Sequence, residues 1–150
     1  MQKKNSNLNR SCSLILALVL LFCSFVPINA SAAEARASYY LSSYQAYVYP
    51  AGNGEIQVWF NVTGVDYMDD IGALWIEVYE SSDNSTWTYK KTYRHTAYTD
   101  LLDQNDIYHS GHVTYQGTAG KYYKAYVCIW AGKDGDGDTR YFWTSAKKAT

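Results

Sequence analysis

The fold is decided by residues Gly117 to Ala131, which read Gly-Thr-Ala-Gly-Lys-Tyr-Tyr-Lys-Ala-Tyr-Val-Cys-Ile-Trp-Ala. After a turn bounded by glycines, the side chains alternate between two sets. One set is Tyr123, Ala125, Val127, Ile129 and Ala131, and the other is Tyr122, Lys124, Tyr126, Cys128 and Trp130. A period of two places these sets on opposite faces of a β-strand. We therefore interpret this stretch as a central strand with one face in the core.

Other segments of the chain show the same alternation, whereas amphipathic helical spacing is almost absent. The turn Pro50 to Gly54 supplies Gly and Asn for a tight hairpin. We expect loops at 64–72, 81–85 and 132–138, and an irregular connection at 95–108 with at most one helical turn near Thr99 or Asp100. The predicted strands besides the central one are 39–49, 55–63, 73–80, 86–94, 110–116 and 139–146. About seven short antiparallel strands predict an all-β sandwich.

The amino terminus has the pattern of a secretory signal peptide. Lys3, Lys4 and Arg10 precede the apolar run Leu14–Val26, and small residues follow at Ala30-Ser31-Ala32. The apolar run is shorter than the roughly 20 residues that span a membrane. We expect residues 1–32 to be removed, leaving 33–150 as one secreted domain; cleavage after Ala30 and a retained anchor are the alternatives.

The charge and cysteine content of residues 33–150 limit the classes of partner. Ten basic and fourteen acidic residues give this part a formal net charge of −4, which argues against nucleic acid or an anionic membrane as a partner. Cys12 and Cys23 lie in the predicted signal peptide, so Cys128 has no partner for an intramolecular disulfide. We expect a monomer in which Cys128 is covered by its neighbours; a Cys128-linked dimer is the alternative.

Two segments resemble known β-sandwich domains. Residues 117–127 resemble the Tyr-x-Ala-x-Val entry into the sixth strand of fibronectin type III and immunoglobulin-like domains, in which a tyrosine, here Tyr123, bonds back to the preceding loop. Residues 76–87 resemble the hairpin between their third and fourth strands, in which an Asp caps the turn. The chain also resembles small uncharacterised secreted proteins of Gram-positive bacteria. The resemblance implies an immunoglobulin/fibronectin III-like sandwich of about seven antiparallel strands, and it implies no activity.

The outward set of aromatic residues is the best candidate for a binding surface. If the strands at 73–80, 122–131 and 139–146 share a sheet, Trp75, Tyr79, Tyr126 and Trp130 lie on its outer face, together with either Tyr141 and Trp143 or Arg140 and Phe142. Exposed aromatic side chains stack on sugar rings or accept another protein's apolar surface. The alternative is that they only stabilise the sheet as cross-strand pairs.

Acidic residues and histidines give weaker signals. Asp134, Asp136 and Asp138 alternate as in the first half of a calcium-binding EF-hand loop, but Thr139 and Ser145 stand where that loop needs Gly and Glu. We favour an ordinary acidic hairpin; joint calcium binding with the loop that carries Asp66, Asp69 and Asp70 is the alternative. His109 and His112 are three residues apart, so a strand would send them to opposite faces.

The sequence therefore predicts a secreted binding module that needs no cofactor. The candidate ligand-binding residues are Trp75, Tyr79, Tyr126, Trp130 and Trp143, and the candidate ligand is a polysaccharide or a cell-surface protein. The alternatives are a secreted effector or protein-interaction module that acts through loops or dimerisation, and, as a minor alternative, a hydrolase whose catalytic groups no motif identifies.

Overall fold

A computed structural model describes residues 38–150, which form antiparallel β-strands and one short helical turn. The predicted signal peptide, 1–32, lies outside the described residues. Within 38–150 there is no helix with the length and apolar character that crossing a membrane requires. The elements are β1 (Leu41–Gly52), β2 (Glu55–Ser81), β3 (Thr88–Arg94), the 3-10 turn η2 (Thr99–Leu101), β4 (Leu102–Gln116), β5 (Tyr122–Lys133), β6 (Asp136–Trp143) and β7 (Lys147–Lys148).

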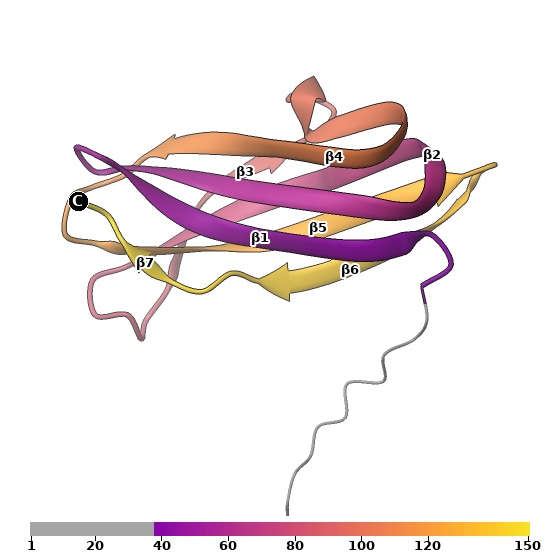
Figure 1. Ribbon diagram of the computed structural model, residues 1–150. Coiled ribbons are helices and arrows are strands. Elements are labelled where there is room, and N and C mark those ends of the chain that lie inside the picture. The colour runs from indigo at the N-terminus through magenta and orange to yellow at the C-terminus, as the bar shows by residue number, and fades with distance from the viewer. Residues whose placement is uncertain (1–37) are drawn as a thin grey trace, which may run out of the picture. The chain divides into compact units, whose positions relative to one another are not determined.

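Strand β2 organises the sheet because its 27 residues take part in two sets of strand pairs. Its first part, 55–63, lies between β1 and β4, and its last part, 75–80, lies between β3 and β5. The register with β4 shifts between Thr63 and Met68, where the strand passes from one set of partners to the other. With β6 and β7 paired to β5, the seven strands form one curled sheet, a half-barrel (Figure 1).

The predicted all-β, antiparallel class is confirmed, but the described residues give no evidence of an immunoglobulin/fibronectin III sandwich. Such a sandwich has two separate sheets, whereas here β2 hydrogen-bonds through both parts of one sheet. The predicted loop at 64–72 is also wrong, because this segment is part of the continuous strand β2. Met68 and Ile71 are buried along this segment, so it continues the strand although its acidic residues have low strand propensity.

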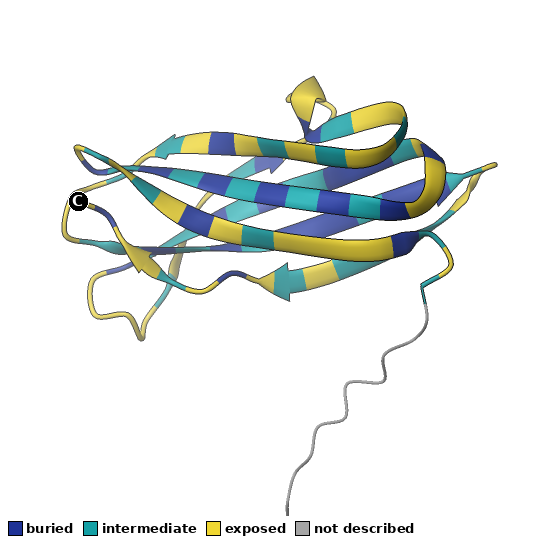
Figure 2. Ribbon diagram, in the orientation of Figure 1, coloured by how far each residue is buried: buried dark blue, intermediate teal, exposed yellow. Residues whose placement is uncertain are grey.

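The core lies on the concave side of the curled sheet and is mainly aliphatic. Along β2 the inward residues Ile56, Val58, Phe60 and Val62 are buried, and Ile76 and Val78 continue the pattern after the bend. Figure 2 shows this alternation as buried bands separated by partly exposed ones along the strand. On β5, Tyr123, Ala125, Val127, Ile129 and Ala131 are all fully buried, as the alternation predicts.

Two-residue turns close two of the hairpins. Asn53 and Gly54 have φ of 52° and 78°, and Asp134 and Gly135 have φ of 55° and 81°, the conformation that Asn-Gly and Asp-Gly turns favour. The second turn is shorter than the predicted loop 132–138, because Asp136 already pairs with Lys133. The irregular connection predicted at 95–108 is also shorter, since β4 begins at Leu102, directly after the helical turn that the sequence anticipates.

Both local motifs behind the resemblance are present. The hydroxyl of Tyr123 accepts a hydrogen bond from the Thr118 N–H at 2.8 Å and donates to Glu80 at 2.5 Å, so it ties the turn before β5 to the end of β2. Asp83 caps the turn after β2 by accepting from the N–H groups of Ser85 and Thr86, both at 2.9 Å.

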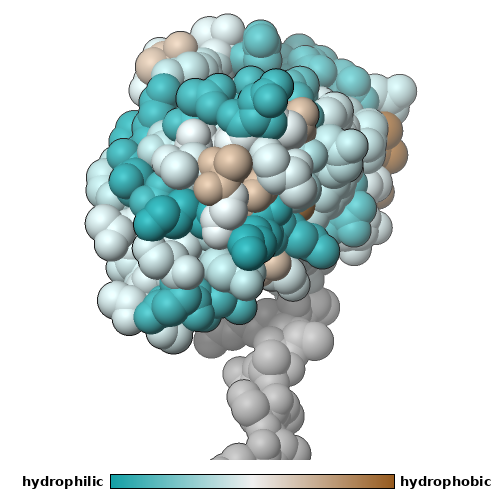
Figure 3. All heavy atoms as spheres, turned by 90° about the vertical axis from the view of Figure 1, so that its left-hand side faces the viewer, coloured by the Kyte–Doolittle hydropathy of each residue, from teal (hydrophilic) through white to brown (hydrophobic). Residues whose placement is uncertain are grey.

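The end of the sheet that carries the β1–β2 turn has a mainly hydrophilic surface with scattered apolar residues (Figure 3).

Candidate functional site

The register of four neighbouring strands brings aromatic residues together on the outer face of the sheet. One row across the strands pairs Glu77 of β2 with Tyr126 of β5, and Tyr126 with Trp143 of β6. In the row on one side, Cys128 of β5 lies between Trp75 of β2 and Tyr141 of β6. In the row on the other side, Tyr79 of β2 pairs with Tyr89 of β3. We call this set the aromatic platform; its members are Trp75, Tyr79, Tyr89, Tyr126, Tyr141 and Trp143.

The rings of the platform form one continuous series of contacts. Tyr126 stacks on Trp143 with centroids 4.8 Å apart and an interplanar angle of 28°. Trp143 meets Tyr79 at 4.9 Å, and Tyr79 meets Tyr89 at 5.8 Å. On the other side, Trp75 lies 5.5 Å from Tyr126 and 6.0 Å from Tyr141. Each ring therefore contacts a neighbour across the sheet.

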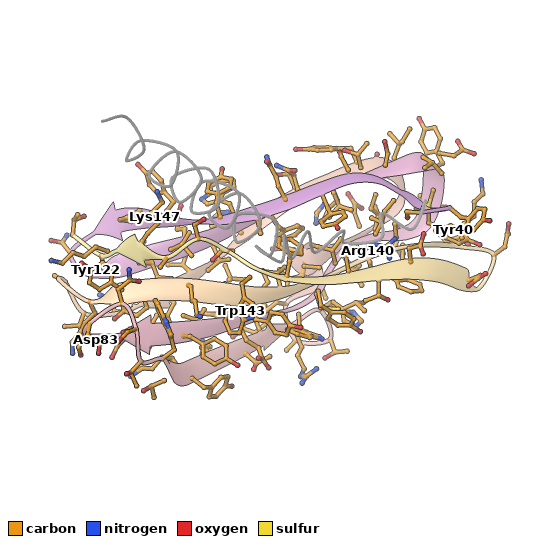
Figure 4. All side chains as sticks on the ribbon, turned by 90° about the horizontal axis from the view of Figure 1, so that it is seen from below. Tyr40, Asp83, Tyr122, Arg140, Trp143 and Lys147 are labelled. Carbon is orange, nitrogen blue, oxygen red and sulfur yellow. The ribbon has the colours of Figure 1, made fainter. Side chains whose placement is uncertain are left out.

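Much of the platform remains in contact with solvent. Tyr89, Tyr141 and Trp143 are 52%, 58% and 47% exposed, while Trp75, Tyr79 and Tyr126 are partly buried. In Figure 4, Trp143 is labelled midway along the sheet, between Asp83 toward one end and Arg140 toward the other. The platform is thus an accessible, central part of the described surface.

Polar and charged groups lie among the rings. The ammonium of Lys124 sits 4.1 Å from the ring centroid of Trp143 and 4.5 Å from that of Trp87, a double cation–π contact. Glu77 accepts a hydrogen bond from the Tyr79 hydroxyl at 2.9 Å, and this bond is the largest cause that raises the pKa of Tyr79. Arg94 is exposed and pairs in register with Trp75. The platform therefore offers hydrogen-bond donors and acceptors beside flat apolar rings.

Trp130, which the sequence places in the same group, lies apart from the platform. It follows Cys128 on the outer face of β5 and lines a solvent-open groove of about 630 Å³. Its indole lies directly against Gly132 and Gly137. A Cβ atom at Gly137 would be only 2.5 Å from the Cη2 and Cζ2 atoms of Trp130. The groove is completed by Asp70, Leu74, His95, Thr99, Leu102, Asp103 and Gln104.

Cys128 is on the outer face but is covered. Its side chain is 1% exposed, and burial raises the pKa of the thiol to about 11, with a smaller opposing effect from a hydrogen bond with Tyr141. A thiol nucleophile must be accessible and deprotonated. In this conformation Cys128 is neither, so it packs as a small apolar residue beneath the platform.

The acidic residues near the β5–β6 turn bond to the protein itself. Asp138 accepts from the Ser38 hydroxyl and from the N–H of Tyr40 at 3.1 Å. Strand β2 at Asp69 and the β5–β6 turn at Asp134 do meet, since Asp69 accepts from the N–H of Asp134 at 2.7 Å. No group of His, Cys, Asp and Glu side chains within 38–150 has the arrangement of a metal site.

His109 and His112 point to opposite faces, as the sequence predicts. His109 is in register with Val62 and lies 5.4 Å from the ring of Phe60, whereas His112 stacks on the ring of Trp59 at 4.3 Å. The two rings therefore do not bind one ion together. The hydroxyl of Ser110 donates to the carbonyl of Phe60 at 3.2 Å, so it is directed at the backbone rather than at either histidine.

The sequence-based site is brought together in part. Trp75, Tyr79, Tyr126 and Trp143 converge, and the open choice on β6 is resolved in favour of Tyr141 with Trp143. Sequence reasoning missed Tyr89, which belongs to the predicted strand at 86–94 but whose pairing partner was not assigned. Sequence reasoning also missed Lys124 as a member of the site. Its position between Tyr122 and Tyr126, on the same outward face of the strand, could have indicated that it lies among aromatic rings.

No family model and no curated protein match this chain. Among solved structures it is similar to the sporulation control protein Spo0M from Bacillus subtilis, with 11% identity and a TM-score of 0.38, covering 68% of this chain and 47% of Spo0M. It is also similar to a family 76 glycoside hydrolase from a bovine Bacteroides thetaiotaomicron strain, with 17% identity and a TM-score of 0.31. That match covers 71% of this chain and 20% of the hydrolase. The chain thus corresponds to less than half of either protein.

Proposed function

We propose that this protein is a secreted, non-catalytic binding module that recognises a polysaccharide through the aromatic platform. Sugar rings have apolar C–H faces and hydroxyl edges, so they are recognised best where flat aromatic rings lie beside hydrogen-bonding groups. The single observation that carries the proposal is the continuous series of ring contacts from Tyr89 to Tyr141, with the charged groups of Glu77 and Lys124 beside the rings.

The mixture of groups favours a glycan over an apolar protein surface. A purely apolar partner would leave the carboxylate of Glu77 and the ammonium of Lys124 without solvent, at a cost in free energy. Sugar hydroxyls can donate to the first group and accept from the second. The cross-strand contacts also hold the rings in place, which lowers the entropy cost of binding.

Retention on insoluble polysaccharides tests this proposal. The protein is applied to cellulose, chitin, xylan and peptidoglycan, and the bound fraction is measured. We expect retention on at least one of them, and we expect Trp143→Ala and Trp75→Ala to reduce it by about tenfold or more, the equivalent of one lost stacking contact. Trp59→Ala is the matched control, because Trp59 is also an outer-face tryptophan but stacks on His112 in the other part of the sheet. Absence of retention, or equal loss in all variants, would contradict the proposal.

We also keep as a proposal a relation to immunoglobulin/fibronectin III-like domains and to small secreted proteins of Gram-positive bacteria. The corner formed by Tyr123 and the turn capped by Asp83 support it. The continuous β2 strand marks a departure from those domains.

A further inference from the structure

The groove over Trp130 begins where the aromatic platform ends. Trp130 is two residues beyond Cys128 on the same face of β5, and β5 runs without a register shift along β6. Leu74, which lines the groove, is adjacent in sequence to Trp75 of the platform. From Lys124 to Trp130, six strand residues cover about 20 Å at roughly 3.3 Å each. One sugar ring cannot span that length, but a polymer chain can.

Trp130 is positioned in the groove by two glycines. Neither Gly132 nor Gly137 has a positive φ, but a Cβ would also crowd a backbone oxygen, that of Asp136 at 2.8 Å from Gly132 and that of Ala131 at 2.6 Å from Gly137. A Cβ at either position would come closer to the indole than real Cβ atoms approach other atoms. The absence of both side chains lets the indole lie across the sheet while Trp130 remains partly exposed to the groove.

The polar groups of the groove suit a neutral ligand with hydroxyls. The amide of Gln104 donates to Asp70 at 3.2 Å, and the N–H of Gln104 bonds to Asp103 at 2.8 Å. Asp70 keeps a second oxygen, which can accept from a sugar hydroxyl, whereas the second oxygen of Asp103 lies 3.7 Å from Nδ1 of His109. Because Asp70 and Asp103 are both acidic, they would repel a sugar that carries a carboxylate or phosphate.

We propose that this groove is a second sugar subsite, and that the ligand is a neutral polysaccharide chain that lies along β5 and occupies the platform and the groove together. Trp130 stacks against one sugar ring, and Asp70 and Gln104 accept and donate hydrogen bonds at its hydroxyl edge. A volume of about 630 Å³ is within the range of small-molecule sites. The inference rests on the function proposed above, and it adds the length and charge of the ligand.

Calorimetry with oligosaccharides of increasing length tests the second subsite. The full chain is titrated with cello-, xylo-, manno- and chito-oligosaccharides of one to six sugars. For the series that binds, we expect the affinity to rise about tenfold between the disaccharide and the hexasaccharide, as one added stacking contact would give. Trp130→Ala should abolish this increase and leave disaccharide binding unchanged, whereas Trp143→Ala should weaken binding at every length.

Gly137→Ala provides a second variant that keeps the indole. Its Cβ would crowd both the Trp130 ring, at 2.5 Å, and the carbonyl oxygen of Ala131, at 2.6 Å, so circular dichroism must first show that the variant folds as the unaltered protein does. It should reproduce the effect of Trp130→Ala, while Trp59→Ala should bind as the unaltered protein does. The inference is overturned if the affinity does not depend on length, if Trp130→Ala and Gly137→Ala bind the hexasaccharide normally, or if they lose only thermal stability. In those cases Trp130 serves only to cover the glycines, and the platform remains a binding site. If no sugar binds the unaltered protein, the function proposed above fails as well.

Discussion

The two faces of the β2–β5 pair have the same backbone and opposite chemistry. On the inner face, Ile76 of β2 and Val127 of β5 are paired in register and fully buried. On the outer face, Trp75 and Tyr126 pack on each other but stay partly exposed and keep polar atoms at their edges. We therefore expect the inner face to supply most of the stability and the outer face to tolerate substitution.

The strongest test of this difference uses two neighbouring residues. Ile76→Ala should lower the free energy of unfolding by about 3 kcal/mol, because it opens a cavity in a fully packed core. Trp75→Ala should cost about 1 kcal/mol, since it removes ring contacts at a surface that water can reach. Urea unfolding monitored by circular dichroism measures both values. Similar losses for the two variants would show that the outer face is as structural as the inner one.

The hydroxyl of Tyr123, at the end of the inner face, should give the next largest effect on the free energy of unfolding. Tyr123→Phe should cost about 2 kcal/mol, because the Thr118 N–H loses its acceptor and the Oε2 atom of Glu80 loses its donor beside a fully buried ring. Tyr89→Phe is the control: its exposed hydroxyl shares a hydrogen bond with Thr92, so the cost should be below about 0.5 kcal/mol. The pKa of Tyr123 is raised to about 12, mainly by burial, so the difference between the variants should be the same at pH 7 and pH 9.

The smallest expected effect is a loss of stability in acid. The hydrogen bond from Tyr123 lowers the pKa of Glu80, and the backbone N–H groups of Thr86 and Ser85 lower that of Asp83. Carboxylates with a lowered folded-state pKa stabilise the protein above their unfolded-state pKa, about 4 to 4.5, and this contribution is lost as the pH falls through the folded-state value. Urea midpoints should therefore be constant from pH 7 to pH 5 and fall below pH 4.

The variant Asp83→Asn identifies the source of that acid sensitivity. It keeps an oxygen acceptor but cannot titrate, so its midpoint should be lower at pH 7 and should change less between pH 5 and pH 3. An acid response as steep as that of the unaltered protein would assign the sensitivity to other carboxylates, such as Asp138, whose pKa is lowered chiefly by its bond from Ser38.

The sequence was sufficient to predict which side chains point inward, because alternation is a local property of the strand. The inward residues of β5 and the core residues Ile56 and Val58 of β2 are buried as expected. The resemblance to known β-sandwich domains anticipated the bonds that Tyr123 and Asp83 make within a few residues of their own turns. Local geometry therefore carries most of the correct part of the prediction.

Pairing between distant strands was not predictable in the same way. Asp66, Asp69 and Asp70 indicated a loop, but hydrogen bonds from β4 and β5 hold this segment as a strand. The contact between Tyr79 and Tyr89 depends on a register shift between Val78 and Tyr79, which no local pattern specifies. The separation of Trp130 from the platform depends likewise on the groove that β4 and its preceding turn help to form.

The continuous β2 strand also has a consequence for cooperativity. Because the same strand pairs with β1 and β4 at one end and with β3 and β5 at the other, neither part of the sheet can open without disturbing the other. Residues 38–150 should therefore unfold in one all-or-none transition. Any ligand that binds the outer face of β5 would then stabilise the distant β1–β2 hairpin that it never touches, and slowed amide hydrogen exchange there would report its binding.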